Sequence, residues 1–192
     1  MSIAVIPTKV ITGPGTQFSY CYPFEPKSIN GGTPKYSCQL KIPKSDTKTV
    51  GAIHAAMEAA YAEGESKLKG SGKSVPPLSA LKTPLRDGDI ERADDPDYAG
   101  YWFLNANSTT PPHVVDAQCQ PIFDASEVYS GCFGKASITF YAFNNNGNRG
   151  IACGLNGLQK IKDGPHLGGR ASAEEDFGVF TEEGEDNEDF LA

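Results

Sequence analysis

The sequence lacks the patterns that would place it among secreted, membrane-spanning or zinc-binding proteins. No apolar run approaches the ~18 residues of a membrane span, and MSIAVIPTKV has no basic start before a long apolar stretch, so we expect no secretory signal. No C-x-x-C pair occurs, and the number of cysteines is odd. We therefore expect small buried thiols in a soluble cytoplasmic protein. The cysteines are Cys21, Cys38, Cys119, Cys132 and Cys153.

Motifs for nucleotide hydrolysis and metal binding are incomplete. Residues 70–74 (GSGKS) end like a phosphate-binding loop, but Lys67 stands where the first glycine is required. Residues 87–92 begin like a calcium loop, but Tyr98 stands where the bidentate glutamate belongs. The histidines match no zinc spacing. We expect no enzyme activity, no cofactor and no metal ion. The histidines are His54, His113 and His166.

Basic residues are absent from the end of the chain. All 17 Lys and Arg lie at or before Arg170, whereas nine of the 24 Asp and Glu fall in the last 19 residues. The formal net charge of -7 therefore hides a weakly cationic body and a strongly acidic tail. Because the tail shows no hydrophobic periodicity, we expect residues 173–192 to be disordered and residues 1–172 to form one domain.

The chain contains alternating apolar and polar segments that are typical of β-strands. The clearest is 135–155, in which Asn146-Gly147 predicts a type I′ turn between two strands. This turn pairs Asn145 with Asn148 and places Tyr141 and Phe143 on the polar side, opposite residues with almost no side chain. The predicted pairs on the core face are Ala142–Ile151, Phe140–Cys153 and Ile138–Leu155, and those on the polar side are Phe143–Gly150, Tyr141–Ala152 and Thr139–Gly154.

The two rings on the polar side of this hairpin have two interpretations. They shield bare backbone or lie under another segment, or they form a platform on which flat ligands stack. In the second case, Lys135 and Arg149 would meet negative charge at the ends of the platform.

Four other segments are predicted to be strands. In 17–24, four rings recur at every second position, which favours a core wall. In 35–42, Lys35 and Lys41 point outward, where they serve solvation or contact phosphates. In 101–107, Tyr101 and Phe103 share the side that otherwise carries asparagines. The segments are 3–11, 17–24, 35–42 and 101–107, and the four rings are Phe18, Tyr20, Tyr22 and Phe24.

One convincing helix is predicted over residues 49–69, with apolar residues at helical spacing and glycines at its end. The Pro-rich and charged stretch 71–99 and the irregular stretch 108–132 read as insertions. The fold class is therefore mainly β with one main helix. The helical stripe is Val50, Ile53, Met57, Ala60 and Tyr61.

Rings on polar strand faces, interleaved with lysines, fit single-stranded nucleic acid. Its unstacked bases gain ~1–3 kcal/mol each on aromatic rings, and its phosphates attract lysines. Duplex DNA would require a groove-reading helix, which the sequence does not show. A tethered acidic tail would compete for the same groove at an effective concentration of ~mM, or would only confer solubility.

Three segments resemble a family of bacteriophage single-stranded-DNA-binding proteins. They are LKTPLRDGDIERADDPDYAGYWF (81–103), EVYSGCFGKASITFYAFNNNGNRGIACGLNGLQKIKDG (127–164) and GGRASAEEDF (168–177). The resemblance implies an OB-fold, a closed five-stranded barrel, and a role in phage DNA replication and recombination in the host cytoplasm. It also implies similarity in plan to the T-odd phage helix-destabilising protein and bacterial SSB, whose acidic tails recruit replication enzymes.

We therefore expect sequence-independent binding of single-stranded DNA, with a tail that binds a polymerase, helicase or nuclease. The alternative is a protein-interaction adaptor whose acidic tail mimics nucleic acid. The oligomeric state stays open, a homodimer included. The expected DNA contacts are Lys35, Lys41, Tyr101, Phe103, Lys135, Tyr141, Phe143 and Arg149. The expected contacts in the tail are Glu185, Asp186, Glu188, Asp189 and Phe190, although Leu191 and Ala192 follow this phenylalanine, which is terminal in the related tails.

Overall fold

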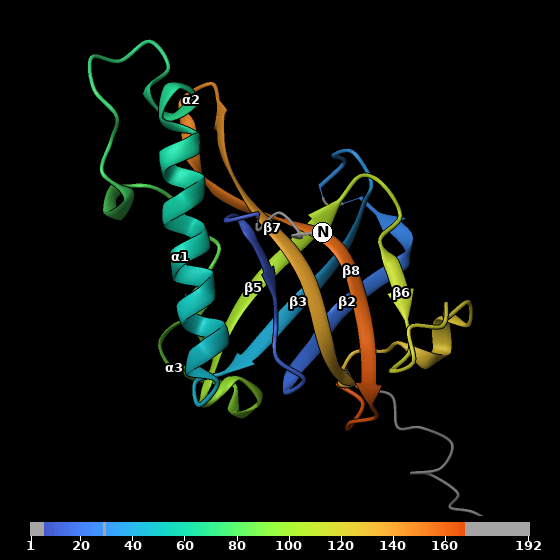
Figure 1. Cartoon of the computed structure of the whole chain (residues 1–192). Coiled ribbons are helices and arrows are strands. Elements are labelled where there is room, and N and C mark those ends of the chain that lie inside the picture. The colour runs from blue at the N-terminus through green and yellow to red at the C-terminus, as the bar shows by residue number, and fades with distance from the viewer. Residues whose placement is uncertain (1–5, 29, 168–192) are drawn as a thin grey trace, which may run out of the picture.

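A ring of five strands forms the centre of the computed structural model, which describes residues 6–28 and 30–167. Strand β7 pairs with both β2 and β8, and this pairing closes the ring (Figure 1). With one main helix beside it, the ring confirms the predicted mainly-β OB-fold. In order around the ring, the strands are β2 (Thr16–Lys27), β3 (Lys35–Pro43), β5 (Tyr101–Ser108), β8 (Asn148–Lys162) and β7 (Phe133–Asn145).

Short elements extend the ring. Strand β1 (Lys9–Ile11) pairs with β7, β4 (Arg86–Asp87) pairs with β5, and β6 (His113–Val115) runs parallel to β8. The short helices are α2 (Glu65–Lys69), α3 (Gly88–Glu91), η1 (Leu78–Ala80), η2 (Pro96–Tyr98) and η3 (Ala125–Glu127).

The β7–β8 hairpin has the predicted turn and register. Asn146 and Gly147 both have positive φ, 52° and 89°, as a type I′ turn requires. Asn145 pairs with Asn148, and all six predicted pairs beyond the turn are observed. Phe143 and Tyr141 therefore share the outer face of the hairpin.

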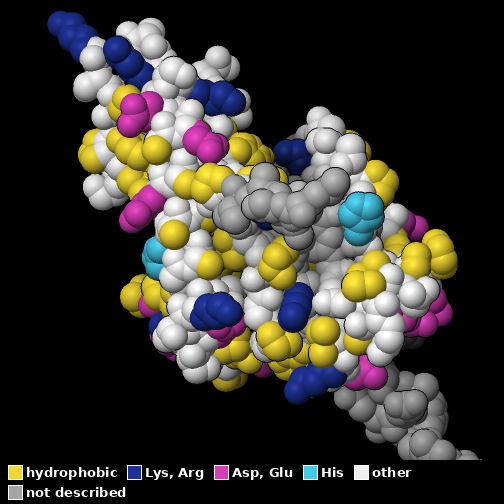
Figure 2. Space-filling model, in the orientation of Figure 1, with side chains coloured by type: hydrophobic (Ala, Val, Ile, Leu, Met, Phe, Trp, Pro, Cys, Tyr) yellow, Lys and Arg dark blue, Asp and Glu magenta, His cyan; other side chains and the backbone are white. Residues whose placement is uncertain are grey.

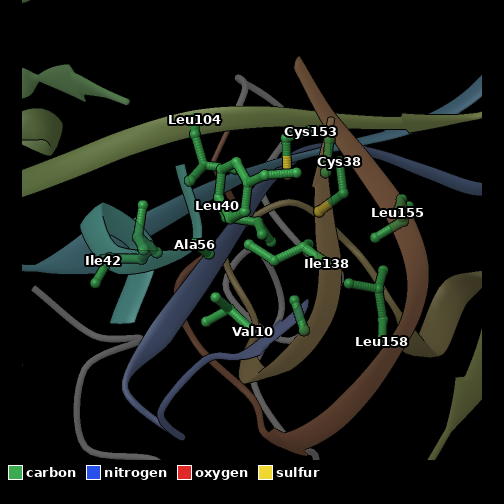
Figure 3. Close-up of a cluster of buried hydrophobic side chains, with 14 of the residues drawn as sticks. Val10, Cys38, Leu40, Ile42, Ala56, Leu104, Ile138, Cys153, Leu155 and Leu158 are labelled. Atoms are coloured by element: carbon green, nitrogen blue, oxygen red, sulfur yellow. The ribbon is translucent and has the colours of Figure 1, made fainter. Parts of the chain in front are cut away.

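The core fills the inside of the ring and the space beneath α1 (Thr47–Glu63). Alternate residues of each ring strand point inward, and α1 lies against β1 and β7 (Figures 1 and 3). The side chain of Asp46 caps this helix by accepting a hydrogen bond from the Thr49 backbone N–H at 3.1 Å. Buried residues from strands and helix include Phe18, Leu40, Leu104, Ile138, Phe140, Ile53, Ala56 and Met57.

The predicted helix 49–69 is divided at Gly64. A Cβ on this glycine would lie 2.2 Å from the Cβ of Ala142, so the close approach of the helix to β7 requires glycine here. Helix α2 starts after this break and also contacts β7. Counting ring strands only, α1 follows the second one, because β1 lies outside the ring.

The prediction that four rings of 17–24 form one core wall is correct for Phe18 and Phe24 and wrong for Tyr20 and Tyr22. Tyr20 has φ 43°, and an extra residue enters β2 between Ser19 and Tyr22. This bulge turns Tyr20 and Tyr22 outward, where they are 55% and 41% exposed, whereas Phe24 is half-buried against the core.

Three of the five cysteines are buried, as expected, and all five are free thiols. Burial raises the pKa of the Cys132 thiol to about 11, so this side chain stays protonated at neutral pH. The buried thiols are Cys38, Cys132 and Cys153.

The predicted disordered tail lies outside the described residues, as do the tail contacts Glu185, Asp186, Glu188, Asp189 and Phe190. No helix in the described part of the chain is long and apolar enough to cross a membrane.

Candidate nucleic-acid interface

The outer face of strands β2, β3 and β5 carries polar side chains in register. Lys41 lies opposite Phe103, Gln39 opposite Asn105, and Ser37 opposite Asn107. One end of this face is covered by a chain segment, and the other end is open.

Tyr98 of η2 covers the first end. Its ring meets the edge of the Phe103 ring at a centroid distance of 5.1 Å, and its hydroxyl donates a hydrogen bond to the side-chain oxygen of Gln39. Phe103 is only 2% exposed, so the expectation that its ring is displayed to solvent is wrong. Residues 88–98 fold back over β5. The alternation of residues within a strand does not predict such a contact between separate segments.

Lys41 lies under the same segment, residues 88–98, which we call the cover. Its exposure is 1%, and its ammonium stands 4.9 and 4.8 Å from the ring centres of Tyr98 and Tyr101. The expectation that Lys41 points into solvent is therefore wrong. Desolvation lowers the pKa of this ammonium, with Asp97 and Asp95 acting in the opposite direction. Tyr101 itself is half-buried.

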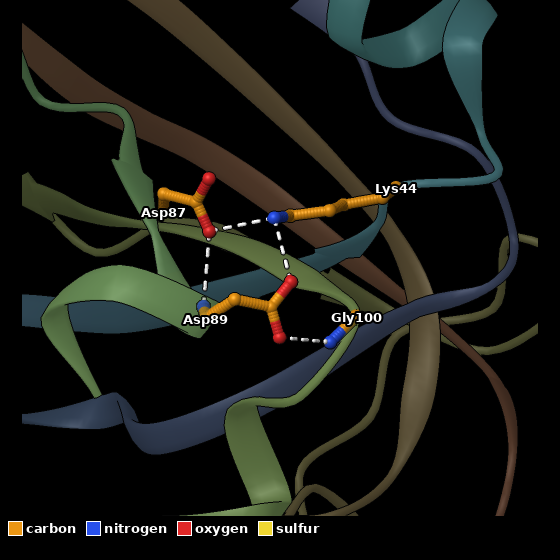
Figure 4. A network of polar contacts seen from close by, with 4 residues as sticks. All are labelled: Lys44, Asp87, Asp89 and Gly100. Atoms are coloured by element: carbon orange, nitrogen blue, oxygen red, sulfur yellow. Dashed lines mark hydrogen bonds and ion pairs between the residues drawn. The ribbon is translucent and has the colours of Figure 1, made fainter. Parts of the chain in front are cut away.

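An ion-pair network anchors the cover to the ring (Figure 4). The Lys44 ammonium lies 2.6 Å from Asp87 Oδ1 and 2.7 Å from Asp89 Oδ2, while Asp89 Oδ1 accepts a hydrogen bond from the Gly100 N–H at 2.9 Å. The hydrogen bond from Lys44 lowers the pKa of Asp89. The cover is therefore a fixed part of the fold, and its aspartates would repel a phosphate chain from this end of the face.

The open end of the face has the opposite character. A depression of about 250 Å³ is lined by two lysines, and the ammonium of Lys27 stands 5.7 Å from the ring centre of Tyr22 and 3.8 Å from Oε2 of the exposed Glu25. Lys35 lines this depression and is exposed on the outer face, as predicted from the strand pattern. Sequence reasoning missed Tyr20, Tyr22 and Lys27, because the bulge that exposes the tyrosines occurs without a glycine or asparagine to signal it. The lining residues are Lys27, Gly32, Thr33, Lys35, Ser37 and Asn107.

The outer face of β7 carries a second set of accessible groups. Tyr141 is 48% exposed, and Lys135 lines a depression of about 430 Å³ together with Lys9 and His113. Phe143 is half-buried, since the backbone of Lys82 crosses beside its partner on β8. Of the two interpretations of the hairpin rings, Phe143 therefore fits the first, in which the ring lies partly under another segment.

Arg149 does not stand beside these rings. It pairs with Asn144, and the two side chains lie on the same side of the hairpin as Ala142, facing α2. Its Nη1 donates a hydrogen bond to the Leu68 carbonyl at 2.8 Å. The expectation that Arg149 ends a ring platform is wrong, and its observed contact is with the last turn of α2.

The two open surfaces meet at Gly154. This glycine pairs with Asn107 of β5, and a Cβ placed on it would lie 3.7 Å from Cε1 of Tyr141 and 3.9 Å from the Asn107 carbonyl oxygen. The Tyr141 ring thus lies over the junction of β5 and β8, next to the depression that contains Lys35. We call this continuous surface, from Lys27 and Lys35 across Asn107 to Tyr141, the open face.

Within 6–28 and 30–167, no group of three or more His, Cys, Asp or Glu side chains is arranged to hold a metal ion. The open face offers aromatic rings, amides and ammonium groups, which suit stacked bases and phosphates.

Comparison with known proteins identifies the family. The family model described as the single-stranded-DNA-binding protein of Enterobacter phage Enc34 matches residues 8–191. The chain belongs to this family.

Structural relatives agree with this assignment and with the resemblance seen in the sequence. The Enc34 protein, solved in complex with single-stranded DNA, has 27% identity and a TM-score of 0.65, covering 84% of this chain and 90% of that one. Gp2.5, the single-stranded-DNA-binding protein of bacteriophage T7, has the same fold at 17% identity and a TM-score of 0.57, covering 84% and 90%.

A sequence relative comes from another phage. Putative protein p50 of Acyrthosiphon pisum secondary endosymbiont phage 1 is 35% identical over 162 residues, which are 79% of this chain and 84% of that protein.

Proposed function

We propose that this protein binds single-stranded DNA without sequence preference, using the open face. The observation that carries the proposal is that an exposed ring, Tyr141, lies next to a depression lined by Lys27 and Lys35. Rings stack on any base, at ~1–3 kcal/mol per base, and ammonium groups attract any phosphate. Membership in the Enc34 family supports the same function.

Within this proposal, the contacts expected from the sequence, together with Tyr22 and Lys27, which the structure adds, divide into three groups. Tyr141 and Tyr22 stack bases, and Lys35, Lys27 and Lys135 contact phosphates, because all five are accessible on the outer faces of the ring. Phe103 and Lys41 serve the packing of the cover instead, since both are nearly fully buried. Phe143 and Tyr101, which are half-buried, contribute only the accessible part of their rings.

The acidic tail has a separate role in the proposal. Residues 174–192 carry nine acids on a weakly cationic body, so they compete with DNA for the open face at an effective concentration of ~mM. When DNA displaces the tail, Glu185, Asp186, Glu188, Asp189 and Phe190 become available to replication proteins. This arrangement fits a role in phage DNA replication and recombination.

A binding titration tests the function. Full-length protein is titrated into labelled oligo-dT and into a duplex of equal length, at several salt concentrations, with fluorescence anisotropy as the readout. We expect affinity for the single strand that falls with salt, because each neutralised phosphate releases counterions. Failure to bind any oligonucleotide, with or without residues 174–192, would overturn the proposal and favour the adaptor alternative.

A further inference from the structure

A cationic projection extends the molecule beyond the ring. It consists of α2 and the loop after it, residues 65–82, and stands beside the tip of the β7–β8 hairpin (Figure 1). This range contains four lysines and a single acid, Glu65. Figure 2 shows several Lys and Arg side chains at this end of the molecule, with Asp and Glu side chains close to them. The lysines are Lys67, Lys69, Lys73 and Lys82, and all are exposed.

The helix macrodipole accounts for only part of this charge. Lys67 and Lys69 lie in the last turn of α2, where cations stabilise a helix. Lys73 and Lys82 lie outside the helix and have no such role. In the described part of the chain, none of the four ammonium groups forms an ion pair with a carboxylate.

The projection is held in a defined position. Asn144 Nδ2 donates a hydrogen bond to the Lys67 carbonyl at 2.9 Å, next to the contact of Arg149 with Leu68. Farther along the loop, the Tyr61 hydroxyl donates to the Pro76 carbonyl at 2.8 Å. The base of the loop is fixed as well, since Lys82 Nζ lies 2.6 Å from Asn148 Oδ1. The lysines are therefore presented on an anchored support.

The open face leads toward this support. Along the outer face of β7, Tyr141 is followed by Phe143, whose partner on β8, Gly150, lies against the backbone of Lys82. A strand that stacks on Tyr141 and continues along β7 would reach Lys82 at the hairpin tip, with α2 on the other side of that tip.

We propose that the lysine projection is a second phosphate-binding site, which holds the part of a long DNA strand that runs past the ring. This inference rests on the proposed function, because it requires a strand on the open face. It predicts that the projection contributes to the binding of long strands and not to that of short ones.

Two double variants with equal charge change test the site. Lys69→Ala with Lys73→Ala removes two projection lysines that make no side-chain hydrogen bond in the described structure, and Lys48→Ala with Lys162→Ala removes two exposed lysines elsewhere. Each is titrated with oligo-dT of about 8 nucleotides, which lies within the ~4–16 nucleotides that one OB-fold occupies, and of about 25 nucleotides, which exceeds them. Circular dichroism and thermal unfolding verify that both variants fold.

The expected result is a length-dependent loss. The projection variant should bind the long strand about fivefold more weakly and reduce the slope of log affinity against log salt by about 1.4, since each phosphate contact contributes ~0.7 for single strands. Its affinity for the short strand, and both affinities of the control variant, should change less than twofold. Equal losses for both lengths, or equal losses in both variants, would overturn the inference, whereas failure of the unmodified protein to bind either strand would overturn the proposed function itself.

Discussion

The ammonium of Lys41 donates a hydrogen bond to Oε1 of Gln17, 3.0 Å away, across the β2–β3 ladder. This cation lies on the outer face of the barrel, yet it is 1% exposed because Tyr98 covers it. In this protein, therefore, part of the OB-fold surface that typically contacts oligonucleotides is occupied by its own chain.

The first prediction separates Lys41 from Lys35. Lys41→Met should leave the affinity for oligo-dT within twofold, because the cover keeps this ammonium from phosphates. The change in the free energy of unfolding should be within about 1 kcal/mol, since a buried charge is costly to desolvate. Lys35→Ala should weaken binding and lower the salt slope by about 0.7. A loss for Lys41→Met as large as that for Lys35→Ala would show that the cover opens to DNA.

The second prediction concerns stacking on Tyr141. Tyr141→Ala should weaken oligo-dT binding by about 5- to 150-fold, which corresponds to the ~1–3 kcal/mol of one stacked base. Tyr141→Phe should retain most of the affinity, because the ring is kept. Phe123→Ala removes a ring that is 88% exposed outside the open face and should have no effect. Fluorescence anisotropy measures all three, and equal affinities for the two alanine variants would contradict the stacking role.

The third prediction uses the ion pairs of the cover. Lys44 holds the pKa of Asp89 below its usual 3.8, so this carboxylate stabilises the fold at pH values above 3.8, and the contribution is lost as pH falls through the lowered pKa. Asp89→Asn should therefore be less stable than the unmodified protein at pH 7, and this difference should shrink as the pH drops below 3.8. Urea unfolding at pH 7 and at acid pH measures it; a difference that persists unchanged at acid pH would exclude the ion pair as its source.

The fourth prediction concerns the acidic tail. Ending the chain at Ala173 should tighten oligo-dT binding, and the gain should be larger at low salt, because salt screens the competition between tail and DNA. A full-length variant with the nine tail acids changed to their amides should reproduce the gain if charge is responsible. Unchanged affinity in both proteins would leave the tail with protein recruitment or solubility only.

The hairpin was predictable because its determinants are local. A two-residue turn that requires positive φ, flanked by alternating residues, fixes every pair between Asn145 and Leu155. The same register places Arg149 opposite Asn144, on the side of Ala142. The sequence therefore contained the information that this arginine faces away from the two rings.

The buried state of Phe103 and Lys41 was not predictable from alternation. It depends on residues 88–98, which reach the outer face of the ring through tertiary contacts such as that of Lys44 with Asp89. The exposure of Tyr20 and Tyr22 depends on one bulge at a tyrosine, a residue type that rarely adopts positive φ. Each difference from the expected site arises where a non-local contact or a rare backbone conformation overrides the period of two.

Strands β7 and β8, with 13 and 15 residues, are the longest strands among the described residues. Deleting Asn144 and Asn145 from one strand and Asn148 and Arg149 from the other would preserve the inward–outward order of the remaining pairs. It would also remove the attachment points of α2 and of the Lys82 loop. A shorter hairpin would therefore leave the pairs of the barrel intact, and under the inference above it would weaken the binding of long strands only.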